Sequence, residues 1–205
     1  MPPTGHKVAG VFVLLASRVA FATTAADVCP ATADPCVVSS VTAVAPGSTL
    51  DFGSRALDVQ NKGKLVVPSG LMTILAGSVR VESGGDLLGS TSSDTGASIK
   101  VMTSGDIRVE TGANGAGTVD VSASLNPGEI DLLAHGNVVI DGQVNSNASN
   151  TQGSGGVINV AADGNVSVTG AIRAFAGTLG LGGAVVVTAG GTLTQSGRAS
   201  CRERV

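Results

Sequence analysis

One short phrase recurs six times along this chain and limits the folds that the chain can adopt. Each copy has two apolar residues two positions apart, three further residues, a glycine, and then another apolar residue or pair. The glycines recur at intervals of 22, 20, 31, 28 and 27 residues. A fixed phrase with spacers of variable length is typical of stacked repeat proteins. The six glycines are Gly63, Gly85, Gly105, Gly136, Gly164 and Gly191.

The spacing inside the phrase predicts β-strands, as the copy Leu57-x-Val59…Gly63-x-Leu65-x-Val67 illustrates. Apolar residues two apart lie on one face of a strand. Glycine followed by a polar residue favours a bend, because glycine adopts positive φ at little cost. A further glycine and apolar pair often follow the second strand. Three short strands and their bends, about 20 to 30 residues in all, describe one coil of a right-handed parallel β-helix.

Six such coils, with one copy of the phrase in each, would form an all-β rod on the order of 30 Å long. The segments 110–118 and 145–155 are rich in Gly, Asn, Ser and Thr, and we expect them to bulge out at bends, where extra residues cost little. No helix is expected after the N-terminal leader. A β-sandwich and a β-propeller are the competing folds, but both would need longer strands or hairpin signals.

The N-terminus predicts a secretory signal in residues 1–26. His6 and Lys7 precede a short apolar stretch, and Ala20-Phe21-Ala22 supplies the small residues that a signal peptidase needs. A cut after Ala26 is the alternative. The apolar stretch is shorter than the roughly 20 residues that span a bilayer, and no other segment of the chain is a transmembrane candidate. A leader on a cytoplasmic protein is the other interpretation.

Residues 27–50 differ from the repeats and are expected to cap the open end of the β-helix, which we place at 51–196. Cys29 and Cys36 lie in this segment, and a pair at this spacing suits a small disulfide loop in an oxidising compartment. Two free thiols are the alternative. A metal site would need more ligands than this pair offers.

The last nine residues, 197–205, carry three arginines in a region with almost no other charge. They resemble the translation of a sequencing-library adapter, and we set them aside from the fold. A natural basic tail is the alternative. If the segment is an artefact, the natural protein continues beyond Ser196.

Charge and composition argue against several classes of partner. Between residues 27 and 196 there are 7 Lys and Arg against 14 Asp and Glu, a net charge of −7. Nucleic-acid binding instead depends on a basic surface. The only aromatic residues in this region are Phe52 and Phe175, so stacking surfaces are scarce.

No residue stands out as catalytic, and no metal or cofactor site is predicted. His135 is the only histidine after the leader, and it lies in a bend. Paired carboxylates about 5 to 10 Å apart could cleave glycosides, yet the acidic residues that follow repeat glycines are explained by turn formation. The carboxylates considered are Asp86, Asp106, Asp131, Asp141 and Asp163.

The segment from Gly155 to Ile172, Gly-Gly-Val-Ile-Asn-Val-Ala-Ala-Asp-Gly-Asn-Val-Ser-Val-Thr-Gly-Ala-Ile, resembles the repeats of filamentous haemagglutinins and autotransporter passengers. The resemblance extends over about 57–194. It implies an exported bacterial β-helix, often an adhesin, and for an autotransporter it implies an outer-membrane barrel further along the chain.

We therefore expect a secreted or cell-surface stalk or passenger that is adhesin-like, with a binding or a purely structural role, and not an enzyme. Its expected partner is a host or matrix surface ligand, either protein or glycan. The alternative is the non-catalytic N-terminal part of a carbohydrate-active β-helix enzyme, such as a polysaccharide lyase or a glycosidase.

Overall fold

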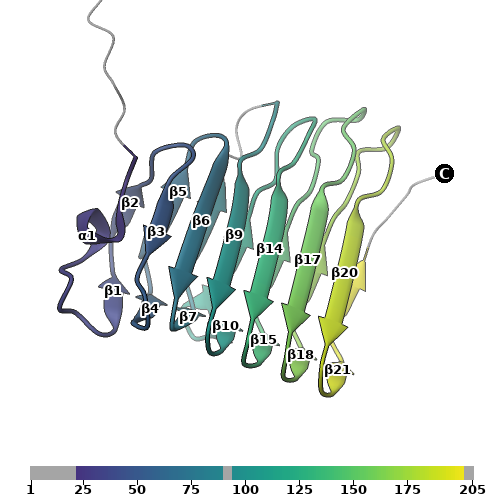
Figure 1. The fold of residues 1–205 in the computed structure, drawn as a ribbon. Helices are drawn as coiled ribbons and strands as arrows, with labels where there is room; N and C mark the ends of the chain where they lie inside the picture. Colours follow the sequence, from purple (N-terminus) through teal and green to yellow (C-terminus); the bar gives the residue numbers. More distant parts are fainter. Residues whose placement is uncertain (1–21, 90–93, 201–205) are drawn as a thin grey trace, which may run out of the picture.

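The computed structural model describes residues 22–89 and 94–200, and the chain in these ranges forms a parallel β-solenoid of about six turns with almost no helix. The predicted fold class is therefore confirmed. Figure 1 shows the strands stacked side by side from the N-terminal end to the C-terminal end of a rod. Residues 1–21 of the predicted signal peptide and residues 201–205 of the segment attributed to an adapter lie outside the described residues.

Three parallel sheets form the walls of the rod, and each coil contributes one strand to each sheet. Sheet A and sheet B have seven strands each, and these strands are three or four residues long. Sheet A contains β1 (Cys36–Val38), β4 (Ala56–Val59), β7 (Ser78–Val81), β10 (Ile107–Val109), β15 (Val138–Ile140), β18 (Val166–Val168) and β21 (Leu193–Gln195). Sheet B contains β2 (Val41–Ala43), β5 (Lys64–Val67), β8 (Asp86–Gly89), β13 (Thr118–Asp120), β16 (Gln143–Asn145), β19 (Ala171–Arg173) and β22 (Arg198–Ser200).

Sheet C has six strands, and five of them are six residues long. The chain passes from sheet A to sheet B to sheet C in every circuit. In Figure 1 it descends through the front strands of sheet C and returns upward behind them while advancing along the rod, which is a right-handed path. The strands of sheet C are β3 (Thr49–Asp51), β6 (Leu71–Ala76), β9 (Ser98–Thr103), β14 (Glu129–Ala134), β17 (Val157–Ala162) and β20 (Ala184–Ala189).

Like residues stack on like residues between the coils. On sheet C, Ile74 pairs with Val101, Val101 with Leu132, and Leu132 with Val160, and all four are at most 1% exposed. Burying each such side chain is worth about 1.5 to 3 kcal/mol. The inward rows therefore form one long, thin core, and the parallel pairing rules out a β-sandwich and a β-propeller.

The recurring phrase does not mark one fixed corner of the coil. Gly63 and Gly85 lie between strands of sheets A and B, whereas Gly105, Gly136, Gly164 and Gly191 lie between strands of sheets C and A. The prediction of one equivalent copy per coil is wrong, because two corners share the same local pattern. In phase with Gly63 and Gly85, the residues that precede the later strands of sheet B are Gly117, Gly142, Gly170 and Gly197.

The reason for glycine at these corners also differs from the prediction. Among the described residues, the glycines with positive φ are others, such as Gly53 and Gly70. At Gly63 an added Cβ would lie 1.9 Å from the carbonyl oxygen of Val38 in the preceding coil, and at Gly105 it would lie 2.7 Å from Gly77 O. Close approach of neighbouring coils therefore requires glycine here.

The two predicted insertions lie outside the three sheets except for their end residues Thr118 and Asn145, which belong to β13 and β16. In the segment 110–118, β11 (Thr111–Gly112) and β12 (Gly115–Ala116) form a small antiparallel hairpin. Glu110, at the base of this hairpin, accepts hydrogen bonds from Arg80 Nε at 2.9 Å and Nη2 at 2.8 Å. The segment 145–155 lies largely between β16 and β17, at the corner between sheets B and C. Both segments bulge at bends as expected.

The N-terminal end of the rod is covered by one helical turn and a short loop. Helix α1 (Ala25–Val28) buries Ala25, and a disulfide joins Cys29 to Cys36 with 5.8 Å between their Cα atoms. Arg55 donates to the carbonyl oxygens of Pro30 and Ala33 across this loop. The expectation of no helix is wrong by this one turn.

The first coil also begins earlier than the sequence indicated. Strands β1, β2 and β3 pair with β4, β5 and β6, so the solenoid starts at Cys36 and not at residue 51. The covering segment is correspondingly shorter than 27–50. At the other end, Val185 and Val187 of β20 are only partly buried. Beyond them, Arg198–Ser200 of the segment assigned to an adapter pairs with β19 in sheet B.

Candidate functional site

A groove crosses the outer face of sheet C, and its first wall is a row of mostly apolar side chains that point away from the core. In this row each residue is the register partner of the next on the neighbouring strand. Met102 is 41% exposed. The groove encloses about 650 Å³, which is within the range of about 300 to 1,000 Å³ for small-molecule sites. The row consists of Leu75, Met102, Leu133, Ala161 and Thr188.

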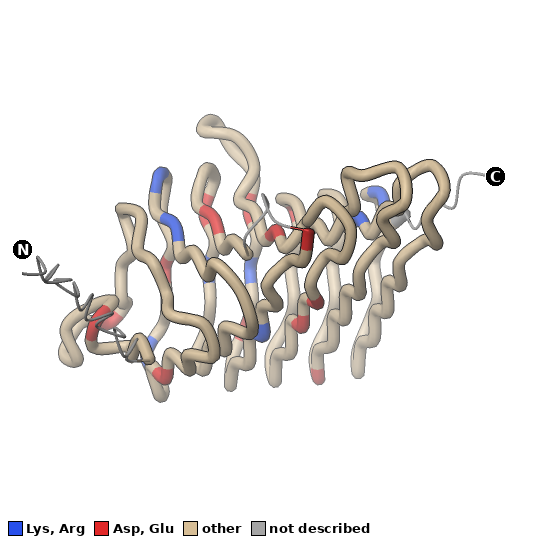
Figure 2. The backbone as a smooth tube through the Cα atoms, turned by 90° about the horizontal axis from the view of Figure 1, so that it is seen from above, with Lys and Arg blue, Asp and Glu red and all other residues tan. Residues whose placement is uncertain are grey.

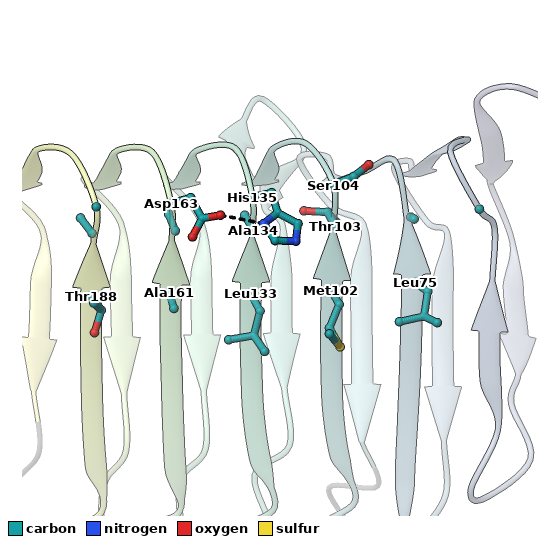
Figure 3. Close-up of a pocket in the computed structure, with 15 residues that line it drawn as sticks. Leu75, Met102, Thr103, Ser104, Leu133, Ala134, His135, Ala161, Asp163 and Thr188 are labelled. Atoms are coloured by element: carbon teal, nitrogen blue, oxygen red, sulfur yellow. Dashed lines mark hydrogen bonds and ion pairs between the residues drawn. The ribbon is translucent and has the colours of Figure 1, made fainter.

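The floor of the groove lies at the ends of the strands of sheet C. The last residue of each six-residue strand of sheet C lines it, and four of these five residues are alanine. The second wall is made by the residues that follow the strands, at the corner with sheet A. Figure 3 shows these corner residues facing the apolar row across the ends of the strands. The floor is Ala76, Thr103, Ala134, Ala162 and Ala189, and the second wall is Ser104, His135, Asp163 and Gly190.

The second wall brings together two residues considered from the sequence, His135 and Asp163. His135 Nδ1 lies 2.6 Å from Asp163 Oδ2, and the two side chains are 76% and 72% exposed. Backbone bonds set this pairing, because His135 N–H donates to Thr103 O and Asp163 N–H donates to Ala134 O, both at 3.0 Å. An exposed pair of this kind adds little stability.

Ser104 precedes His135 by one coil in the same row, but its hydroxyl faces the other way. It lies 3.5 Å from Gly77 O, and Figure 3 shows its oxygen turned away from the imidazole of His135. A serine nucleophile needs a base within hydrogen-bond reach. The structure therefore places a serine, a histidine and an aspartate on successive coils without joining them into a catalytic relay.

The other carboxylates considered from the sequence lie apart from the groove and have partners in neighbouring coils. Asp86 Oδ2 is 2.6 Å from Lys64 Nζ, and Asp131 accepts a hydrogen bond from Asn159 Nδ2 at 2.8 Å. Asp141 accepts one from the hydroxyl of Thr169. Among the described residues that line the groove, Asp163 is the single carboxylate.

Asp106 begins a ladder of turn residues at the corner between sheets C and A. Its Oδ1 accepts from the backbone N–H of Asn137 at 2.8 Å and from the Asn137 amide at 3.1 Å. Asn137 Oδ1 accepts in the same way from Asn165, and Asn165 Oδ1 accepts from Thr192 N–H. The backbone N–H of Asn137 is the main cause that lowers the pKa of Asp106, helped by Arg108 and opposed by partial burial. Turn formation thus accounts for Asp106.

A smaller hollow of about 390 Å³ lies on the loops between sheets B and C. The half-buried Phe175 lines it, and its backbone N–H donates to Asn147 Oδ1 at 2.9 Å. None of the described residues that line this hollow has a charged side chain. Its polar side chains are Asn147, Ser149, Thr151 and Thr178.

Neither hollow was predicted from the sequence, although the sequence contains one pattern that indicates the groove. Strict alternation predicts a polar residue after each buried one, yet the strands of sheet C contain the apolar doublets Ile74-Leu75, Val101-Met102 and Leu132-Leu133. The second residue of each doublet faces outward. An apolar residue at an outward position, repeated on successive coils, is the pattern that marks the groove.

The distribution of charge and the positions of possible metal ligands were compared with the needs of nucleic-acid and metal sites. In Figure 2 acidic and basic positions are scattered along the coils and do not gather into a basic stripe. Within residues 22–89 and 94–200, no cluster of three or more His, Cys, Asp or Glu side chains could hold a metal ion. Over the same ranges, no helix has the length and apolar character needed to cross a membrane. Comparisons of this chain with protein-family models, with curated proteins and with solved structures found no match.

Proposed function

We propose that this chain is the β-helical part of an exported bacterial protein, secreted or on the cell surface, that serves as an adhesin-like stalk. It binds a ligand of a host or matrix surface, protein or glycan, and does not transform it. The observation that carries this proposal is the sheet C groove, the hollow lined by the row from Leu75 to Thr188 and by the corner residues Ser104 to Gly190. The sequence resemblance to haemagglutinin-type repeats and the disulfide of Cys29 and Cys36 support export.

The groove suits an extended partner because it crosses five coils in a line along the rod. Neighbouring strands are about 4.8 Å apart, so the five strands offer one contact residue about every 4.8 Å. The next outward row on sheet C is polar where it passes Thr73, Lys100, Asp131 and Asn159. The row from Leu75 is apolar on four successive strands, although Leu71, Val157 and Val186 also expose apolar surface elsewhere on this face. Burying the row against a partner would remove half-exposed leucine and methionine from water.

The enzyme alternative draws on Asp163 and His135 in the second wall. Glycoside cleavage generally uses two carboxylates about 5 to 10 Å apart, whereas the groove lining has one. Incubating the chain with neutral and acidic polysaccharides and measuring new reducing or unsaturated ends tests this alternative directly. The appearance of such ends, and their loss in Asp163→Asn, would replace binding by catalysis as the function.

Binding by the groove is tested with one variant and a matched control on the same sheet. Leu133→Asp places a charge in the apolar row, and Thr73→Asp places the same charge in the adjacent polar row. The purified chain is passed over immobilised collagen, fibronectin, a neutral glycan and an acidic glycan in a surface plasmon resonance measurement. We expect Leu133→Asp to weaken the bound response at least tenfold, about 1.4 kcal/mol, while Thr73→Asp leaves it unchanged. Equal effects of the two variants, or no response on any of the four surfaces, would contradict the proposal.

A further inference from the structure

The sequence predicts two possible cleavage sites for a signal peptidase, one after Ala22 and one after Ala26. A choice between them decides whether residues 23–26 belong to the leader or to the mature protein. The structure describes these residues, and their contacts with the first coil of the solenoid separate the two possibilities.

Thr23 forms two hydrogen bonds with the corner between β2 and β3. Its N–H donates to Ser48 Oγ at 2.8 Å, and its own Oγ1 accepts from the N–H of Ala45 at 2.9 Å. Ser48 is only 1% exposed, so its hydroxyl depends on a protein partner or on trapped water. Thr23 is thus part of the hydrogen-bonding of the first coil.

The next three residues complete the cover over the N-terminal end of the core. The carboxylate of Asp27 accepts from the N–H of Thr24 at 2.8 Å and from its hydroxyl at 2.7 Å, which holds the start of α1. Ala25 is 6% exposed and belongs to the hydrophobic core. Ala26, in contrast, is exposed. Solenoids need their terminal coil covered, and here the cover begins at Thr23.

We infer that the leader is removed by hydrolysis of the Ala22–Thr23 bond, so that the mature protein begins at Thr23. This inference rests on the proposed export of the chain. One water molecule is consumed: Ala22 gains the hydroxyl and leaves as a carboxylate, and Thr23 keeps the nitrogen as an α-amino group. That amino group retains N–H donors for Ser48 Oγ.

Cleavage after Ala26 would give a protein without these contacts. It would remove Thr23 and Thr24, leave Ser48 without its donor, and take Ala25 out of the core. A buried hydroxyl that loses its partner destabilises the folded state. Ala20 and Ala22 also supply alanine at both positions that the peptidase recognises, while Thr24 and Ala26 supply one alanine.

The full chain is expressed in a bacterium with a secretory pathway, and the intact mass and the N-terminal peptide of the exported protein are measured. We expect an N-terminus at Thr23. Ala22→Lys, which removes the small residue before the bond, should block processing and leave the precursor. Ala26→Lys is the matched control, because Ala26 is exposed and should be dispensable for cleavage at Thr23.

An N-terminus at Asp27, or processing that Ala26→Lys blocks and Ala22→Lys does not, would overturn this inference and leave the export proposal intact. A chain that stays unprocessed in the cytoplasm would overturn both. A second measurement compares the thermal unfolding of chains that begin at Thr23 and at Asp27. We expect the shorter chain to unfold on the order of 5 °C lower, and equal midpoints would also overturn the inference.

Discussion

Asn165 stacks on Asn137 at the corner between sheets C and A, and Asn137 Oδ1 accepts hydrogen bonds from both the backbone N–H of Asn165, at 2.9 Å, and its side-chain amide, at 3.2 Å. The same side chain of Asn137 donates to Asp106 in the preceding coil at 3.1 Å. One amide therefore links three consecutive coils at a corner where the backbone turns.

We expect Asn137→Ala to lower the free energy of unfolding by about 0.5 to 1.5 kcal/mol, because it removes the acceptor of the exposed Asn165 N–H and water replaces it only in part. The measurement is urea unfolding followed by circular dichroism. Gln152→Ala is the control, since Gln152 is exposed and its recorded hydrogen bond comes from the backbone. A loss no larger than that of the control would show that the ladder contributes nothing to stability.

The lowered pKa of Asp106 leads us to expect that the stability of the protein depends on pH in the acidic range. Its pKa in the folded state lies below the ordinary value of 3.8, so its stabilising effect is complete above that value and is lost as the pH falls through the folded pKa. We expect the wild type to lose more stability than Asp106→Asn between pH 5 and about pH 2, by less than about 1 kcal/mol because the group is partly exposed. Unfolding curves at both pH values measure the difference. Parallel curves for the two proteins would rule out this role.

Gly63 tests the close approach of neighbouring coils. A Cβ at this position would lie 1.9 Å from Val38 O, and backbone must move to relieve such a contact. We expect Gly63→Ala to destabilise the protein by about 3 kcal/mol. Gly112→Ala serves as the comparison, because its Cβ would meet the side chain of Ser83 at 3.2 Å in the exposed hairpin. Thermal unfolding of both variants gives the answer, and similar midpoints would contradict it.

Leu132 and Leu133 are adjacent in β14 and face opposite sides of sheet C. Leu132 is fully buried, so Leu132→Ala should cost about 2 to 5 kcal/mol through lost burial and the cavity left behind. Leu133→Ala removes the same atoms from the wall of the groove and should cost about 1 kcal/mol or less. Urea unfolding of the two variants compares them. A large loss at Leu133 would mean that the row supports the fold and not a ligand.

The sequence was sufficient to predict the fold class because the inward positions obey a simple rule. Buried pairs such as Leu57 and Val59 recur with period two, and the corners between them carry glycine. The same pattern led to a wrong assignment of equivalent positions in successive coils. The segments around Gly63 and Gly105 are alike in sequence, but the first joins sheets A and B and the second joins sheets C and A. The strand β3 has one buried residue, Leu50, which explains why the first coil was not recognised.

The candidate site was harder to predict because it depends on which residues share a register. His135 and Asp163 are 28 positions apart, and they meet only because one circuit of the solenoid at that point has the same length. The outward leucine and methionine residues were visible as doublets, but the second wall consists of corner residues that come beside this row only in the folded stack. Local sequence rules describe single strands, whereas these features belong to the stack.

Coil length varies widely while the sheets stay in register. From Gly63 to Gly85 there are 22 residues and from Gly85 to Gly117 there are 32, yet β5, β8 and β13 pair without a break. Part of the surplus is taken up by the hairpin of 111–116, whose residues are mostly exposed, and the rest mainly by the longer link between β8 and β9. This corner is therefore a natural position for grafting a foreign epitope, because a longer insert would be displayed to antibodies while the wall behind it keeps its strand pairing.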